Sequence, residues 1–311
     1  MLPDLLAVAG GLTLLVFGAD AFVRGAAALA LRFGLPPLAV GLTVVAFGTS
    51  APELAVSVEA ALAGAGGLAI GNVLGSNVAN VGLILGLAAL VRAAPVEPAL
   101  LRRDVPAMLA ASIVLGALLL DGRLGRVDGA LLLIGLGLYL RLTLRRSADA
   151  DPADAEPAER VVFGWRTGLL TLGGLGALVV GADALIGGAT DIAAELGVPE
   201  TVVGLTLVAV GTSLPELATS LVAAVRGESG LAVGNVVGSN ILNVLGVLGV
   251  SALVAPLVAS PAGLDATLAA AAAVVGSAAL AGALMWTGRR VERWEGAVLL
   301  AAYGGYLIAV L

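Results

Sequence analysis

Long apolar stretches, separated by short polar or proline- and glycine-containing breaks, run through the whole chain. Most of them exceed about 18 residues, the length at which a helix spans a hydrocarbon core of about 30 Å. Prolines such as Pro36 and Pro37 punctuate the pattern because proline interrupts helical hydrogen bonding. The pattern predicts ten transmembrane helices, at 5–31, 36–63, 68–91, 99–120, 126–145, 164–196, 199–225, 230–254, 263–286 and 294–311.

The stretch from Gly41 to Gly86 occurs twice. GLTVVAFGTSAPELAVS and GNVLGSNVANVGLILG return as GLTLVAVGTSLPELATS and GNVVGSNILNVLGVLG, with one constant shift that aligns Gly41 with Gly204 and Gly86 with Gly249. About 32 of the 53 positions between residues 34 and 86 are identical to their counterparts. We therefore interpret the chain as two copies of one five-helix unit, residues 1–146 and 164–311, joined by a linker at residues 147–163.

Five helices is an odd number, so the second unit must enter the membrane from the opposite side. With the N-terminus outside, 14 of the 16 arginines fall at cytoplasmic helix ends, and only Arg123 and Arg126 fall outside. This asymmetry follows the positive-inside rule. The sequence thus predicts an all-α integral membrane protein of ten transmembrane helices in two inverted-topology repeats, an architecture of many secondary transporters. We expect a multi-pass protein of the cell (plasma) membrane with both termini outside.

The composition supports this class. Hydrophobic residues make up 59% of the chain and charged residues 12%, with a mean hydropathy of +1.07, whereas soluble proteins carry about 25% charged residues. The chain has no cysteine and no histidine, which excludes disulfides, thiol nucleophiles and imidazole- or thiolate-bound metals. The net charge of −6 comes largely from the acidic linker and gives no reason to expect nucleic acid as a partner.

Each repeat places a glutamate, Glu53 or Glu216, inside an otherwise apolar helix directly after a proline. Pro52 has no N–H and clashes with the preceding turn, so the helix should break there. A carboxylate at mid-membrane costs at least about 2.5–3.5 kcal/mol unless it is paired. Because the chain has no lysine and these helices carry arginine only near their ends, we expect the partner to be a bound cation.

Hydroxyl and amide side chains accompany both glutamates. All offer oxygen ligands, which suit hard cations, and Ca²⁺ takes about 6–8 oxygens at about 2.3–2.6 Å. The spacing of Ser76 and Asn80 puts both on one helix face. The candidate ligands are Thr49, Ser50, Ser76 and Asn80 in the first repeat, with Thr212, Ser213, Ser239 and Asn243 in the second.

GTSAPEL with GSNVAN, and GTSLPEL with GSNILN, resemble the two alpha repeats of the sodium/calcium exchanger family, of the prokaryotic ten-helix type within the cation/Ca²⁺ antiporter superfamily. The resemblance covers nearly the whole chain. It implies that Glu53 and Glu216 are the central acidic ligands, and it adds backbone carbonyls of Ala46 and Ala209. It also implies Na⁺/Ca²⁺ antiport by alternating access, with Ca²⁺ and Na⁺ as transported ligands and without a cofactor.

One position departs from the family pattern. Many prokaryotic and potassium-dependent members carry aspartate where this chain has Asn243, whereas animal potassium-independent exchangers carry asparagine. Proton/Ca²⁺ members of the superfamily carry a histidine in the motif, which this chain lacks. These differences bear on which ions are exchanged.

Some alternative functions would use the same fold, and others belong to a different class of protein. H⁺/Ca²⁺ exchange, K⁺-dependent Na⁺/Ca²⁺ exchange and Na⁺ extrusion would use the same architecture, and a cation channel is a further alternative. The motifs contain no nucleophile–base pair, so we do not expect an enzyme. We expect a monomeric transport unit in the lipid bilayer.

For Asp20 and Asp183 we expect a structural role, because Arg24 lies four residues after Asp20.

Overall fold

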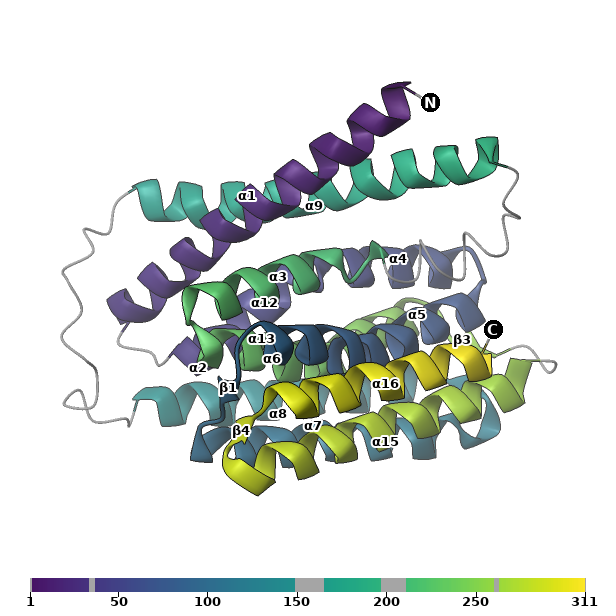
Figure 1. Ribbon diagram of the computed structural model, residues 1–311. Coiled ribbons are helices and arrows are strands. Elements are labelled where there is room, and N and C mark those ends of the chain that lie inside the picture. The colour runs from purple at the N-terminus through teal and green to yellow at the C-terminus, as the bar shows by residue number, and fades with distance from the viewer. Residues whose placement is uncertain (1, 34–36, 149–164, 197–210, 260–262, 311) are drawn as a thin grey trace.

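The computed structural model describes residues 2–33, 37–148, 165–196, 211–259 and 263–310. These residues are almost entirely helical and form a flat bundle with two long helices lying across one face of it (Figure 1). Consecutive segments group into the ten predicted helices, of which the seventh is described only from Gly211 onward. The acidic linker lies outside the described residues except for Ser147 and Ala148, which complete a helix.

The first repeat begins with one long helix and continues through helices that are broken or locally widened. Its segments are α1 (Leu2–Phe33), α2 (Pro37–Val40), η1 (Gly41–Val45), α3 (Ala46–Thr49), α4 (Ala51–Leu62), α5 (Gly66–Ala79), η2 (Asn80–Leu85), α6 (Gly86–Val91), β1 (Ala94–Pro95), η3 (Leu100–Asp104), α7 (Val105–Leu118), η4 (Leu119–Asp121), β2 (Arg123–Leu124) and α8 (Arg126–Ala148).

The second repeat follows the same order. Its described segments are α9 (Trp165–Glu195), α12 (Leu214–Arg226), α13 (Ser229–Leu242), η7 (Asn243–Val247), α14 (Leu248–Val254), β3 (Leu257–Val258), α15 (Leu264–Gly288), β4 (Arg290–Val291) and α16 (Arg293–Val310). The described helices thus confirm the predicted succession, and their ends differ from the predicted ends by a few residues.

Two short antiparallel ladders join the repeats at opposite ends of the bundle. β1 pairs with β4 at one end, and β2 pairs with β3 at the other. Helix α7 runs from the β1–β4 end to the β2–β3 end, whereas its counterpart α15 runs from β3 to β4. The two repeats therefore cross the bundle in opposite directions, which confirms the predicted inverted topology.

Helices α1 and α9 pack against each other antiparallel along their length (Figure 1). Glycines spaced seven residues apart, on both helices, bring the two backbones together. A Cβ on Gly11 would lie 2.7 Å from the carbonyl oxygen of Gly181, and one on Gly181 would lie 2.9 Å from that of Gly11. Such close approach of small residues is typical of helix packing in membranes.

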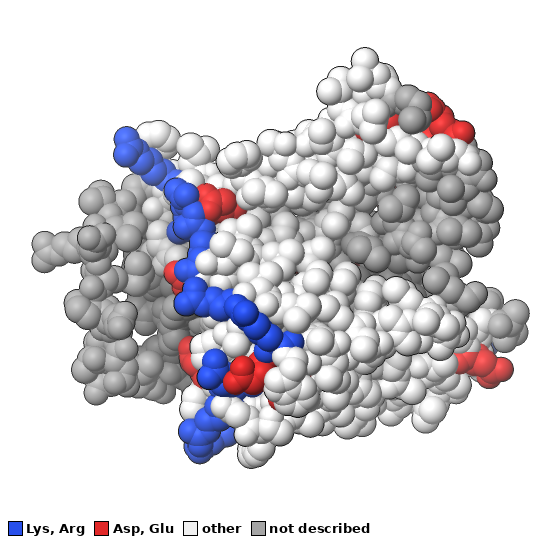
Figure 2. All heavy atoms as spheres, in the orientation of Figure 1, with Lys and Arg blue, Asp and Glu red and all other residues white. Residues whose placement is uncertain are grey.

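The outer surface is apolar, as expected of a lipid-facing protein: Phe17, Ile134, Leu172 and Ile308 are 70%, 68%, 72% and 83% exposed. Six described helices are long and apolar enough to cross a membrane, or seven if the bent pair Leu38–Thr49 and Ala51–Leu62 is one span. On the face shown in Figure 2, the arginines gather at one end of the bundle. Both termini lie at the opposite end (Figure 1).

Candidate cation site

Both candidate glutamates sit at a break in their helix. The chain turns out of helical geometry at Ser50 (φ −81°, ψ 7°) and again at Ser213 (φ −87°, ψ 7°), and a new helix starts one residue later. Pro52 and Pro215 occupy the first turn of these new helices, where the missing N–H costs nothing. In the first repeat the two helix pieces meet at 45°. The predicted proline break is thus confirmed.

The two breaks face each other, and their side chains exchange hydrogen bonds. The Ser50 hydroxyl donates to Oε1 of Glu216 at 3.0 Å, and the Ser213 hydroxyl donates to Oε1 of Glu53 at 3.2 Å. Each glutamate is at most 1% exposed. Two carboxylates from opposite repeats are therefore buried together. Among the described residues, no arginine forms an ion pair with either of them.

The second oxygen of each carboxylate has no hydrogen-bond partner among the described residues. Oε2 of Glu53 and Oε2 of Glu216 are buried and accept no hydrogen bond from the described residues. The same holds for other side-chain oxygens of the predicted ligand set: Oγ of Ser76, Oγ of Ser239, Oδ1 of Asn80 and Oδ1 of Asn243. A buried polar atom without a partner costs about 1–3 kcal/mol, and more when it is charged. Six of the predicted ligand residues thus carry an oxygen that a cation could satisfy.

The two threonines of the set donate across the repeats. The Thr49 hydroxyl lies 3.2 Å from Oδ1 of Asn235, and the Thr212 hydroxyl lies 3.4 Å from Oδ1 of Asn72. The Ala46 carbonyl accepts the N–H of Ser50 at 3.0 Å and lies 3.4 Å from the Thr49 hydroxyl. Ala209 lies outside the described residues.

Widened helical turns begin at the two amide candidates. η2 starts at Asn80 and η7 starts at Asn243, and both are π-helical segments inside otherwise α-helical spans. Single π-turns are frequent at functional sites because they change the direction of the side chains that follow. The sequence analysis did not predict them. Their positions are related by the constant shift between the repeats, which places the two amides equivalently.

Four further asparagines connect the repeats and were not among the predicted ligands. The amides of Asn77 and Asn240 each donate to the other's backbone carbonyl, at 3.2 and 3.3 Å. Asn80 also donates to Oδ1 of Asn240 at 3.0 Å. Asn72 and Asn235 hold the threonines described above. All four could have been found from the repeat, because Asn72 aligns with Asn235 and Asn77 aligns with Asn240.

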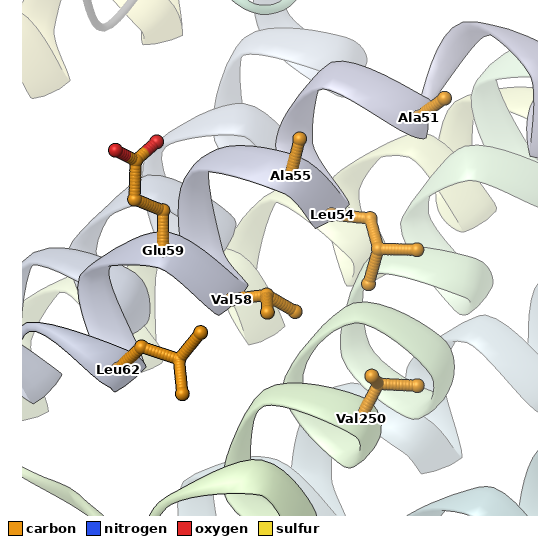
Figure 3. A pocket seen from close by; sticks show the side chains of 7 residues that line it. All are labelled: Ala51, Leu54, Ala55, Val58, Glu59, Leu62 and Val250. Atoms are coloured by element: carbon orange, nitrogen blue, oxygen red, sulfur yellow. The ribbon is translucent and has the colours of Figure 1, made fainter.

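The acidic residues away from this centre do not join it. Asp20 pairs with Arg24 at 2.9 Å, as predicted, and also accepts Nε of Arg226 at 2.6 Å. Asp183 is exposed on α9. A surface groove of about 440 Å³ beside α4 and α14 is lined by apolar side chains and Glu59, whose carboxylate points away from Val250 (Figure 3). The described residues contain no cluster of three acidic side chains.

Comparisons with known proteins agree on one kind of protein. The family model described as sodium/calcium exchanger protein matches residues 4–145 and 167–311. The sodium/calcium exchanger MaX1 of Methanosarcina acetivorans is 34% identical over 96% of both chains, and the inner membrane protein YrbG of Escherichia coli is 43% identical over 79% of this chain and 78% of its own. A solved structure of the sodium-calcium exchanger NCX_Mj, soaked with 10 mM Na⁺ and 10 mM Sr²⁺, superimposes with a TM-score of 0.87 at 34% identity, covering 99% of this chain and 98% of that one.

Proposed function

Because this chain belongs to the sodium/calcium exchanger family, whose members are cation/Ca²⁺ antiporters rather than enzymes, we propose that it exchanges Na⁺ for Ca²⁺ by alternating access. Glu53 and Glu216 are the central acidic ligands of both ions. The hydroxyl, amide and carbonyl oxygens of the other ligands complete the coordination: Thr49, Ser50, Ser76, Asn80 and Ala46, with Thr212, Ser213, Ser239, Asn243 and Ala209.

The observation that carries this proposal is the set of buried oxygens that find no partner among the described residues. Oε2 of Glu53 and Oε2 of Glu216 would be costly to bury beside each other unless a positive charge lay between them. Neutral oxygens from both repeats are unpartnered in the same way. The donor set is all oxygen, which favours Na⁺ and Ca²⁺ over soft transition metals.

Competition for shared ligands couples the two fluxes. Two carboxylates neutralise one Ca²⁺, and the same oxygens hold several Na⁺ in overlapping positions. The two ions cannot then occupy the site together, so the protein carries one kind in each direction. No covalent step is needed, because the Na⁺ gradient across the membrane drives exchange and the protein only alternates the side to which the occupied site opens.

The pair of α1 and α9 is the part that we propose to move. The two helices pack on each other through glycine backbones and lie across the remaining helices as a separate layer (Figure 1). A shared, closely packed seam favours their movement as one body. Sliding of this body past the bundle would open the site first to one side of the membrane and then to the other.

Transport measurements distinguish the possible ions. Purified protein in proteoliposomes is tested for ⁴⁵Ca²⁺ uptake under imposed Na⁺, K⁺ or H⁺ gradients. We expect uptake to follow the outward Na⁺ gradient without K⁺ and without a pH gradient. Uptake driven only by a proton gradient, or only with K⁺, would favour the alternative ions. Acceleration of ⁴⁵Ca²⁺ efflux by external Ca²⁺ separates a carrier from a channel.

We also propose that the arginine-rich end faces the cytoplasm, with both termini outside the plasma membrane and a monomer as the transport unit. The absence of cysteine makes this testable. A single cysteine is introduced at Leu2 or at Arg103, which lie at opposite ends and are exposed. A membrane-impermeant maleimide added to intact cells should label Leu2→Cys and not Arg103→Cys; the reverse would invert the orientation.

A further inference from the structure

Two asparagines outside the proposed ligand set, Asn72 on α5 and Asn235 on α13, occupy equivalent positions in the two repeats. Each precedes a candidate ligand serine, Ser76 or Ser239, by four residues and so lies on the same face of its helix. An asparagine inside a membrane helix is costly unless its amide is satisfied. Both amides are satisfied, and in the same pattern.

The N–H side of each amide binds its own repeat. Asn72 donates to the Ser57 hydroxyl at 3.0 Å and to the Glu53 carbonyl at 3.3 Å. Asn235 donates to the Ser220 hydroxyl at 3.0 Å and to the Glu216 carbonyl at 3.5 Å. The amide group is thereby fixed against the helix that carries the glutamate, and its carbonyl oxygen must point away from that helix.

The oxygen side of each amide binds the opposite repeat. Oδ1 of Asn72 accepts the Thr212 hydroxyl, and Oδ1 of Asn235 accepts the Thr49 hydroxyl. A threonine hydroxyl has one hydrogen and two lone pairs. When the hydrogen is directed at the asparagine, both lone pairs of the threonine oxygen stay available to a cation.

The Thr49 hydroxyl has two competing acceptors within reach, Oδ1 of Asn235 at 3.2 Å and a carbonyl of its own helix that lies slightly closer. The Thr49 hydroxyl lies 3.1 Å from the Val45 carbonyl, one turn earlier in its helix. Threonines in helices often donate to such a carbonyl. Without the asparagine, this carbonyl would win the competition for the hydrogen, and the lone pairs of the hydroxyl would point in another direction.

We infer that Asn72 and Asn235 are positioning residues, each of which orients a ligand hydroxyl of the other repeat. Asn72 acts through Thr212, and Asn235 acts through Thr49. This inference rests on the proposed function, because it takes both threonines as cation ligands. As a consequence, each half of the site depends on an amide from the other half. Cation affinity then depends on how the two repeats are placed relative to each other, because this placement decides whether each asparagine reaches its threonine.

Double-mutant cycles test the pairing, and the chain provides its own matched control. Half-saturating Ca²⁺ for Na⁺-driven ⁴⁵Ca²⁺ uptake is measured for Asn72→Leu, Thr212→Val and Thr49→Val, alone and combined. We expect about a tenfold increase for each single variant, the loss that corresponds to about 1.4 kcal/mol. Asn72→Leu with Thr212→Val should stay near tenfold, because both remove one contact. Asn72→Leu with Thr49→Val should reach about a hundredfold, because the two belong to different contacts.

The mirror cycle with Asn235→Leu should show the reverse pairing, non-additive with Thr49→Val and additive with Thr212→Val. If Asn72→Leu does not reach the membrane, Asn72→Ser replaces it, since serine is too short to reach Thr212. Equal coupling of Asn72 to both threonines, or a loss of thermal stability without a change in half-saturating Ca²⁺, would overturn the inference. Absence of Na⁺-driven uptake in the unmodified protein would instead overturn the proposed function.

Discussion

Two pairs of acidic residues are repeated at equivalent positions of the two halves of this chain, yet they lie in opposite environments. Glu53 and Glu216 are buried, and each accepts a serine hydroxyl from the other repeat. Asp20 is 30% exposed and lies between two arginines, and Asp183 is exposed. Repetition alone therefore does not mark a cation site. The glutamates differ in that they are buried and each has one carboxylate oxygen without a partner among the described residues, a charge that a bound cation or proton would offset.

The sharpest test of this comparison removes the charge from the buried pair. Glu53→Gln and Glu216→Gln each keep the shape and take away half of the negative charge that faces a divalent ion at low dielectric. We expect each to reduce Na⁺-driven ⁴⁵Ca²⁺ uptake by about 100-fold or more, with membrane levels unchanged. Normal uptake by either variant at normal expression would contradict the assignment.

Much of the fold was predictable because it depends on local patterns in the sequence. Apolar length gave the helices, and the constant shift gave the repeats. The break at Pro52 followed from the missing N–H, and the ion pair of Asp20 with Arg24 followed from their spacing of four residues. For the helices, the break and the ion pair, the physical cause lies within one helix, and the repeat can be seen directly in the sequence.

What could not be predicted depends on contacts between the repeats. Asn72 stands out in the sequence as clearly as Ser76, but its partner Thr212 is 140 residues away, and only the packing of α5 against the opposite break brings them together. The ladders between β1 and β4 and between β2 and β3 have the same cause. The π-helical turns η2 and η7 involve one extra residue per turn, which a hydrophobic pattern does not reveal.

A second test adds a charge to the buried group. The amide of Asn243 has no hydrogen-bond partner among the described residues, so Asn243→Asp loses no hydrogen bond with them and adds a titratable group to a proposed ligand set that already contains two carboxylates. We expect wild-type uptake to need no K⁺ and to change little with pH through this position, whereas the variant should change several-fold between about pH 6 and pH 9. The measurement is Na⁺-driven ⁴⁵Ca²⁺ uptake across that range, with and without K⁺.

Asn80→Asp is the matched control for this test. The Asn80 amide donates to Oδ1 of Asn240 at 3.0 Å, so an aspartate there would place two acceptors against each other. It should therefore lower uptake most where this aspartate is ionised, because a protonated carboxyl can donate to Asn240 again. An absolute K⁺ requirement in the unmodified protein, or the same pH profile for Asn243→Asp and wild type, would show that position 243 does not set the charge of the site.

A third test applies the same chemistry to the partly exposed pair. Asp20→Asn removes an ion pair with Arg24 and Arg226, and exposed ion pairs contribute about 0–1 kcal/mol. We expect uptake to stay within about threefold of wild type. Arg226→Gln should have no larger effect, because it removes only one of these two contacts and leaves Asp20 paired with Arg24. Complete loss of transport in a folded Asp20→Asn protein would place Asp20 among the functional residues.

The smallest effect is expected from a third group of carboxylates, those of the acidic linker. Asp149–Glu156 contains four of them with alanine and proline, and nothing in this sequence offers apolar surface to bury. Its deletion shortens a connection whose closure entropy changes slowly with length, so uptake and half-saturating Ca²⁺ should remain within about twofold of wild type. A variant in which the same eight residues are replaced by glycine and serine keeps the length and removes only the charge. If both variants shift half-saturating Ca²⁺ alike, the linker carboxylates sense Ca²⁺, and acids outside the buried pair matter after all. If only the deletion changes transport, the length of the connection is what matters, and the distinction between buried and exposed carboxylates stands.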